Sequence, residues 1–138
     1  MDTLKTTRTI RHIAFVCLHG SAKSVIAAEY LNRVAAKRGL ALHAFSAGRE
    51  PDPDIPQNVV VGLREKGFDV SGRTPATANA ATLAHADEVI AFGCDLGQDA
   101  GGKPQRQWSD CPAVSEDFAA AWAYIVAHVD ELVAAPVK

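Results

Sequence analysis

Strong charge of either sign is missing from this chain. Its 138 residues include 14 lysines and arginines and 16 aspartates and glutamates, so the formal net charge is −2. The longest basic run is the pair Lys37-Arg38. Because nucleic acids and anionic membrane surfaces are bound by a concentrated positive field, we expect the protein to bind neither.

Long hydrophobic runs are missing too. The first apolar run, residues 13–18, is too short for the core of a secretory signal and is followed directly by His19 and Gly20. The apolar C-terminal stretch contains Asp130 and Glu131, which do not suit a membrane span. We therefore expect a cytoplasmic protein without a membrane segment.

Cysteine is too scarce for a disulfide framework. The three cysteines, Cys17, Cys94 and Cys111, form an odd and widely spaced set, which suits a reduced cytoplasm. The five histidines show no His-Glu-x-x-His spacing, and the chain has no Cys-x-x-Cys pair. We expect no metal site.

What is present fits one globular domain. Apolar residues make up 48% of the chain and charged residues 22%, which are ordinary values for a soluble domain. Residues 1–9 are polar and aperiodic, so we predict a flexible leader there and a single domain over residues 10–138.

Strand-like and helix-like patterns alternate along this domain. Apolar runs predict strands over residues 12–17, 40–46 and 87–92, and a short fourth strand is predicted over residues 105–108. Amphipathic patterns predict helices over residues 24–38, 56–66 and, weakly, 77–84, and a last helix capped by Ser115 with Glu116 and Asp117 in its first turn. This order predicts an α/β fold of three layers (α/β/α), in which a four-stranded parallel sheet has helices on both sides and binds its ligand beyond the carboxyl ends of the strands.

The loop over residues 17–24 joins the first strand directly to a helix. Its sequence is Cys17-Leu18-His19-Gly20-Ser21-Ala22-Lys23-Ser24. Loop amides and the positive end of the following helix form an anion site, and the same field favours a nucleophilic thiolate at Cys17. We therefore predict that a tetrahedral oxyanion binds to residues 18–23, with charge added by Lys23 and a hydrogen bond to the sulfur from Ser24.

This loop has two other interpretations. Cys17 is equally compatible with a small buried residue at a strand end, where many free cysteines lie. A nucleotide-binding P-loop is rejected because that motif requires glycine immediately before the lysine, and Ala22 stands there.

The order of motifs resembles the low-molecular-weight protein tyrosine phosphatases and the arsenate reductases that share their fold. The signature of that family is a cysteine, five residues and Arg-Ser, and here Cys17 is followed by five residues and Lys23-Ser24. The Ser-Ala-Gly turn at residues 46–48 and the Gly-Phe-Asp-Val-Ser-Gly stretch at residues 67–72 are similar as well. Residues of about 11 to 134 match in order, so the resemblance implies the family's fold.

The resemblance also implies roles for residues outside the loop. Glu50-Pro51 and the Phe-Gly-Cys segment ending at Cys94 look closer to the arsenate reductases, in which a second cysteine attacks the first and a third resolves the disulfide. Cys94 fits the second position, whereas Cys111, the only candidate for the third, has the wrong placement for a simple transfer. Asp110 fits the general acid of the phosphatases. Cys94 is as compatible with a packed strand end, and Asp110 with a turn.

Three departures from the family bear on activity. Lys23 replaces an arginine whose planar fork holds two oxyanion oxygens. We expect the loss of this two-point contact to lower the rate on the order of a hundredfold. Gly20 replaces an asparagine but can adopt the positive φ required there. His19 replaces a small residue and either contacts the ligand or faces solvent.

Three functions stay open at this point. The preferred one is a thiol-dependent arsenate reductase that uses Cys17, Cys94 and a small-molecule thiol or thioredoxin-like reductant. The second is a phosphatase for phosphotyrosine or a small phosphomonoester, which uses Cys17 and Asp110. The third is a non-catalytic oxyanion-binding module, which Lys23 favours. Neither enzymatic route requires a metal or an organic cofactor.

Overall fold

The structure is a computed structural model that describes residues 9–134. Except for Thr9, the predicted leader lies outside these residues, so the division into a leader and one domain stays a prediction. The elements follow in the order β1 (Arg11–Cys17), α1 (Lys23–Arg38), β2 (Leu42–Gly48), α2 (Gln57–Glu65), α3 (Ala80–Leu83), β3 (Glu88–Ala91), β4 (Gln105–Gln107) and α4 (Phe118–Ala134). No described helix is long and apolar enough to cross a membrane.

The four strands form one parallel sheet in the order β2-β1-β3-β4. All four predicted strands are therefore confirmed, with bounds shifted by up to two residues. β1 lies in the interior of the sheet and pairs with β2 along its whole length, ending at Cys17 opposite Gly48. The loop that follows β1 therefore begins in the middle of the carboxyl edge of the sheet.

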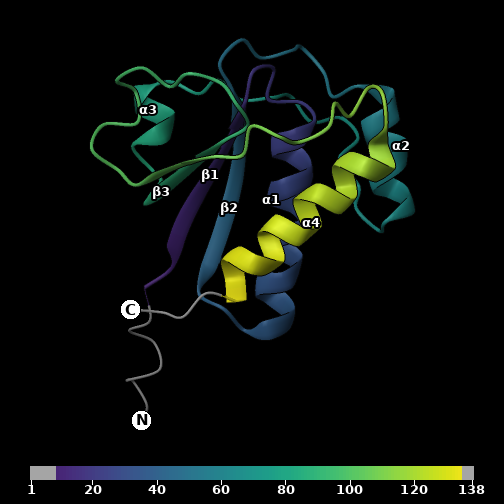
Figure 1. Cartoon of the computed structure of the whole chain (residues 1–138), viewed down its shortest axis with the longest axis horizontal. Helices are drawn as coiled ribbons and strands as arrows, with labels where there is room; N and C mark the ends of the chain where they lie inside the picture. The colour runs from purple at the N-terminus through teal and green to yellow at the C-terminus, as the bar shows by residue number, and fades with distance from the viewer. Residues whose placement is uncertain (1–8, 135–138) are drawn as a thin grey trace.

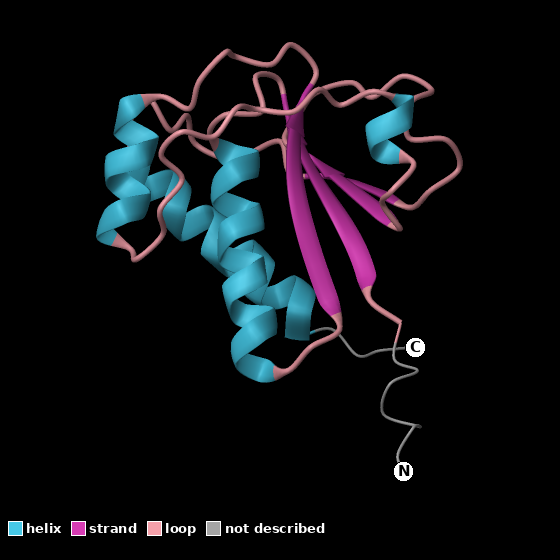
Figure 2. Cartoon of the chain, turned by 180° about the vertical axis from the view of Figure 1, so that it is seen from behind, coloured by secondary structure: helices cyan, strands magenta, loops and turns pink. Residues whose placement is uncertain are grey.

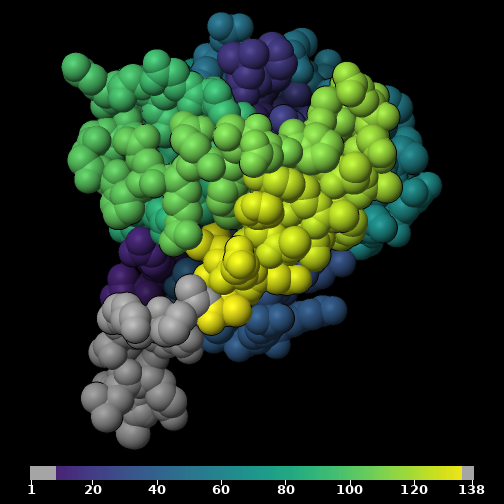
Figure 3. All heavy atoms as spheres, in the orientation of Figure 1, coloured from purple at the N-terminus to yellow at the C-terminus, as the bar shows by residue number. Residues whose placement is uncertain are grey.

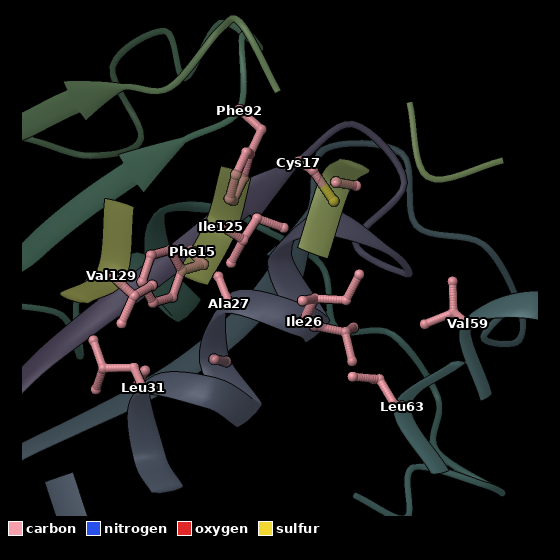
Figure 4. Close-up of a cluster of buried hydrophobic side chains, with 14 of the residues drawn as sticks. Phe15, Cys17, Ile26, Ala27, Leu31, Val59, Leu63, Phe92, Ile125 and Val129 are labelled. Carbon is pink, nitrogen blue, oxygen red and sulfur yellow. The ribbon is translucent and has the colours of Figure 1, made fainter. Parts of the chain in front are cut away.

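Helices α1, α2 and α4 pack on one face of the sheet, as Figures 1 and 2 show from opposite sides. Their buried side chains and those of the sheet form a large apolar cluster, which we call the helix-face core (Figure 4). Its members include Phe15, Cys17, Ile26, Leu31, Val59, Leu63, Phe92, Cys111, Ile125 and Val129. Complete burial of each large side chain contributes about 1.5–3 kcal/mol, so this core dominates the stability of the fold.

The opposite face has a much thinner cover, made of α3 and the segment that leads to β4 (Figure 1). We call its apolar cluster the loop-face core; its buried members are Ala14, Val16, Ala47, Ala78, Leu83, Ala86, Val89, Ala91, Leu96 and Ala100. Alanine predominates because small side chains let the covering backbone approach the sheet closely. The predicted three-layer α/β fold is confirmed, with a third layer of one short helix and a loop.

The helix ends follow local signals in part. Gly39 ends α1 as predicted, with φ of 64° and its N–H bonded to the Ala35 carbonyl. The weak helix predicted over residues 77–84 shrinks to α3, where the Asn79 side chain accepts the N–H of Thr82.

Ser115 does not cap the last helix, so that prediction was wrong. The amides of Glu116 and Asp117 both bond to the Ala113 carbonyl and form a turn, and α4 begins only at Phe118. Asp117 is the capping residue, because its Oδ1 accepts the N–H of Ala120 at 3.0 Å. Aspartate caps as well as serine does, and the turn that precedes α4 places Asp117 at the capping position.

Candidate active site

The loop after β1 presents a row of free backbone amides. The carbonyls of Cys17, Leu18 and His19 accept the amides of residues 49, 50 and 52 at 3.2, 2.7 and 3.0 Å. Because N–H and C=O of one peptide unit point in opposite directions, the amides of residues 18–20 face away from that segment. Within residues 9–134, no group accepts a hydrogen bond from the amides of residues 18–24. Together with the N-terminus of α1, these amides form an anion-binding arrangement.

Two glycines allow the loop to take this course. Gly20 has φ of 63°, the positive value that the sequence predicted. A Cβ on Gly20 would also lie only 2.5 Å from the backbone nitrogen of Gly48, at the end of β2. The loop therefore rests directly on the Ser-Ala-Gly turn, which explains why both motifs contain glycine at these positions.

Cys17 and Ser24 form a buried pair at the base of the loop. Their Sγ and Oγ atoms are 3.1 Å apart, and the two residues are 7% and 0% exposed. Ser24 lies in the first turn of α1, which holds its hydroxyl beneath the sulfur. With the hydroxyl as donor, this hydrogen bond stabilises a thiolate, the form in which cysteine is nucleophilic. The geometry is the one expected of a nucleophile and its supporting serine.

A pocket of about 320 Å³ opens in front of the loop. In Figure 3 the loop reaches the surface at the top of the molecule, between segments of the later chain. The lining residues are Cys17, Leu18, His19, Ser21, Ala22, Lys23, Asp52, Pro56, Asn58, Val59, Phe92, Ala113, Val114 and Ser115. They follow β1, β2, β3 and β4, which is the carboxyl edge that the sequence predicted.

The charges around this pocket are nearly balanced. Lys23 is the only ammonium or guanidinium group in the lining, and it forms no ion pair with any described residue. Asp52 supplies a carboxylate, which accepts the Ser21 hydroxyl at 2.7 Å. His19 Nδ1 lies 3.1 Å from the Glu50 carbonyl and 3.7 Å from Asp52 Oδ1. The rim is thus less positive than the loop alone suggests.

Asp52 is the main site residue that the sequence analysis missed. It stands between Pro51 and Pro53, in the stiff loop expected after the second strand. The one available signal was the position of that loop at the carboxyl edge, where any polar side chain approaches the site.

The predicted acid, Asp110, is exposed and does not line the pocket. Its backbone N–H bonds to the hydroxyl of Tyr124 on α4, a contact that lowers the pKa of Tyr124 while burial, the larger effect, raises it. Trp108, two residues earlier, packs against Phe15 and Phe92, each with ring centroids 5.7 Å apart. The segment that carries Asp110 is therefore anchored, although Asp110 is not among the residues that line the pocket.

The two other cysteines lie on different faces of the sheet. Cys94 is half-buried against the loop-face core, with Sγ 3.7 Å from the Val16 carbonyl, and burial raises the pKa of its thiol. Cys111 belongs to the helix-face core, as Cys17 does. Burial raises the pKa of Cys111 to about 11, with Lys23 lowering that pKa and Cys17 raising it further. Both thiols lie within electrostatic reach of Cys17, whose charge also raises the pKa of Cys94.

No group of three or more histidine, cysteine, aspartate or glutamate residues could hold a metal ion in the part of the chain that the structure describes.

Comparison with known proteins agrees with this site. The family model for low molecular weight phosphotyrosine protein phosphatase matches residues 12–100. A Halobacterium salinarum protein named "putative arsenate reductase" is 30% identical over 98 residues, which are 69% of each chain. Among solved structures, Bacillus subtilis YfkJ has a TM-score of 0.78 at 19% identity, covering 92% of this chain and 94% of its own.

The thioredoxin-dependent arsenate reductase of Corynebacterium glutamicum has a TM-score of 0.73 at 26% identity, covering 93% of this chain and 62% of its own. The expected thiol-dependent oxyanion-processing enzyme is thereby confirmed at the level of the family, which includes arsenate reductases and phosphatases. The chain belongs to the low molecular weight phosphotyrosine protein phosphatase family.

Proposed function

We propose that this protein is a thiol-dependent arsenate reductase with Cys17 as its nucleophile. The observation that carries the proposal is the presence of two further cysteines, Cys94 and Cys111, which follow β3 and β4 at the same edge of the sheet at which Cys17 ends β1. Hydrolysis of a phosphate ester consumes no thiol, whereas reduction of arsenate to arsenite requires two electrons, which two thiols supply as they form a disulfide. The relatives from Halobacterium salinarum and Corynebacterium glutamicum support the same activity.

In the first step, arsenate binds to the free amides of residues 18–23 and to the ammonium group of Lys23. The Cys17 thiolate, supported by the Ser24 hydroxyl, attacks arsenic. A sulfur–arsenic bond forms, an arsenic–oxygen bond breaks, and the oxygen leaves as water with a proton from Asp110. Because Asp110 lies outside the pocket lining, its carboxyl must turn inward to deliver that proton.

In the second step, another thiol attacks the Cys17 sulfur. A sulfur–sulfur bond forms, the sulfur–arsenic bond breaks, and its electron pair remains on arsenic, which leaves as arsenite. A small-molecule thiol or a thioredoxin-like protein then reduces the disulfide by thiol exchange. The thioredoxin dependence of the Corynebacterium glutamicum relative supports a protein reductant.

A phosphatase is the second candidate, because the pocket extends past the loop. Pro56, Asn58 and Val59 line one side and Val114 another, which leaves room for an organic leaving group beside the oxyanion. Phe92 is the only phenyl, phenol or indole ring in the lining, so the aromatic walls that suit a phosphotyrosine are missing from this pocket. This difference favours the small inorganic substrate.

The test uses the reduced protein and its Cys17→Ser variant. Arsenite is measured after incubation with arsenate and either glutathione or a thioredoxin system, and p-nitrophenol is measured after incubation with p-nitrophenyl phosphate. We expect arsenite from the wild type and none from Cys17→Ser, which should still bind phosphate and so prove its loop intact. Hydrolysis of the ester without arsenite would favour the phosphatase. Phosphate binding without either turnover would identify a non-catalytic binding module.

A further inference from the structure

Two thiols compete for the second step, and they lie on opposite faces of the sheet. We infer that Cys111, on the helix face, is the thiol that forms the disulfide with Cys17, and that Cys94 is not. This inference rests on the proposed function for its arsenate chemistry, but the Cys17–Cys111 pair can be tested without arsenate.

The alternation of side chains along β1 separates Cys94 from the nucleophile. Val16 points into the loop-face core and Cys17 into the helix-face core, because successive strand residues face opposite sides. Cys94 packs on the Val16 side, with its thiol directed at the Val16 carbonyl. To reach the Cys17 sulfur, the Cys94 thiol would have to leave this contact and pass around the end of the sheet.

Cys111 is on the same face of the sheet as the nucleophile. Its thiol is 7% exposed and shares the helix-face core with Cys17. Residues 113–115, which follow it directly, line the same pocket as Cys17 and Lys23. The charges of Cys17 and Lys23 both act on the Cys111 thiol. Cys111 therefore lies on the same face of the sheet as Cys17, in the segment that leads into the pocket lining.

The segment around Cys111 is held on both sides. Before it, Trp108 packs against Phe15 and Phe92. After it, the Asn58 side chain donates a hydrogen bond to the Val114 carbonyl at 3.3 Å. The polar contact of the thiol itself is weak, a 3.5 Å approach to the carbonyl of the next residue, Pro112. The segment is therefore fixed, while the Cys111 thiol itself has no strong hydrogen-bond partner among the described residues.

The neighbouring acid completes the proton balance. In the first step Asp110 gives its proton to the departing oxygen and becomes a carboxylate. In the second step this carboxylate takes the proton of the adjacent Cys111 thiol as its sulfur attacks Cys17. The sulfur–sulfur bond forms, the sulfur–arsenic bond breaks, and arsenic is reduced from As(V) to As(III) by the two thiols. An external dithiol then restores both cysteines, and Asp110 is again protonated for the next cycle.

The high pKa of Cys111 suits this order of events. A thiol with a pKa of about 11 is almost entirely protonated near pH 7, so it neither repels the incoming oxyanion nor competes with Cys17 for it. It becomes a nucleophile only when a base is next to it, which is the state of Asp110 after the first step.

The experiment follows disulfide formation in the full-length wild type and in Cys94→Ala, Cys111→Ala and Cys17→Ser. Each reduced protein receives arsenate without external thiol, is alkylated at acid pH, and is analysed by peptide mass mapping. We expect a Cys17–Cys111 disulfide and stoichiometric arsenite in the wild type and in Cys94→Ala. We expect Cys111→Ala to form no such disulfide, and its turnover with a dithiol to fall by about a hundredfold or more.

A parallel experiment treats the same proteins with diamide, which oxidises thiols in the absence of arsenate. A Cys17–Cys111 disulfide with diamide but no arsenite from arsenate would refute the proposed function and leave the thiol pair established. Arsenite production with a Cys17–Cys94 disulfide, or at the wild-type rate in Cys111→Ala, would overturn the inference and leave the proposed function intact. If Cys111→Ala unfolds, Cys111→Ser serves in its place, and thermal unfolding of each variant identifies which to use.

Discussion

The two faces of the sheet share one carboxyl edge but differ in what they bring to it. The helix face is covered by α1, α2 and α4 and contributes the thiol of Cys17, the ammonium group of Lys23 and most of the apolar pocket wall. The loop face is covered by α3 and a loop, and its core is largely alanine. Two residues that both follow a strand can therefore differ in whether they reach the pocket. The difference depends on the face of the sheet on which each one packs.

Arg49 illustrates the difference. It follows the Ser-Ala-Gly turn and, by sequence position, is a candidate to replace the arginine that the binding loop lacks. Its guanidinium is instead committed to the loop face, where it donates to Asp99 at 2.8 Å and to the Ala78 carbonyl at 2.5 Å. Lys23 therefore remains the only ammonium or guanidinium group in the pocket lining.

The largest expected contrast concerns the two cores. Leu63 and Leu83 are both 0% exposed, one on each face. Leu63→Ala should lower the free energy of unfolding by about 4 kcal/mol and Leu83→Ala by about 2 kcal/mol, because the thin loop layer can collapse into the space that is left. Urea unfolding of both variants measures the difference. Equal losses would show that the loop face is packed as rigidly as the helix face.

The next contrast compares one lysine from each face of the sheet. Lys23→Ala should lower kcat/KM for the turned-over oxyanion on the order of a hundredfold, about 2.7 kcal/mol, because the pocket loses its only full positive charge. Lys23→Arg should raise it, since a guanidinium binds two oxygens at once. Lys103→Ala is the control, a lysine beside the loop-face Ala84 carbonyl, and should change nothing. A similar loss in Lys103→Ala would mean that net charge, and not the pocket cation, sets the rate.

A third contrast concerns the support of the binding loop. A Cβ at Gly48 would collide with the backbone of His19 and Gly20, so Gly48→Ala should destabilise the fold by about 2 kcal/mol and weaken phosphate binding. Gly102→Ala, in the loop-face segment, meets no atom within 4 Å and should be neutral. Thermal unfolding and phosphate titration by calorimetry check both. Normal phosphate binding in Gly48→Ala would show that the close contact does not shape the loop.

A smaller effect is expected from the acid at the rim. Asp52→Asn should strengthen phosphate binding by a few-fold, about 0.5–1 kcal/mol, because it removes a negative charge while its amide oxygen still accepts the Ser21 hydroxyl. Asp99→Asn, whose partner is Arg49 on the loop face, should leave phosphate binding unchanged. Titration at low and at high salt distinguishes the two, since the gain from Asp52→Asn should shrink as salt rises.

The smallest contrast appears only at high pH. Folding raises the pKa of Cys111 from 9.0 to about 11, so the native state holds the proton longer than the unfolded chain does. This contribution is complete below pH 9 and is lost as the pH rises from 9 to 11. Cys111→Ala should therefore show a shallower fall in melting temperature over that window than the wild type. Cys94→Ala should show a weaker effect of the same sign, because burial raises its pKa as well.

Local patterns in the sequence were sufficient to predict most of the secondary structure and the position of the loop that follows β1. Apolar runs marked β1, β2 and β3, Gly39 marked the end of α1, and the junction of strand and helix marked the anion loop. These features depend on neighbouring residues, which is why they can be read from one chain. The start of α4 was predicted wrongly, at Ser115, because the turn over residues 113–117 that moves the cap to Asp117 was not recognised.

The tertiary structure alone decided the contacts within the site. Ser21 and Asp52 are 31 positions apart, and the amide of Asp110 meets the Tyr124 hydroxyl across the start of α4, so no local pattern joins them. The faces assigned to Cys94 and Cys111 depend on how a loop and a segment before α4 pack against the sheet. The sequence by itself determined the fold and the position of Cys17 in its loop, because backbone periodicity and a helix N-terminus are local. Which other side chains line the pocket around Cys17 was set by packing between residues far apart in the chain.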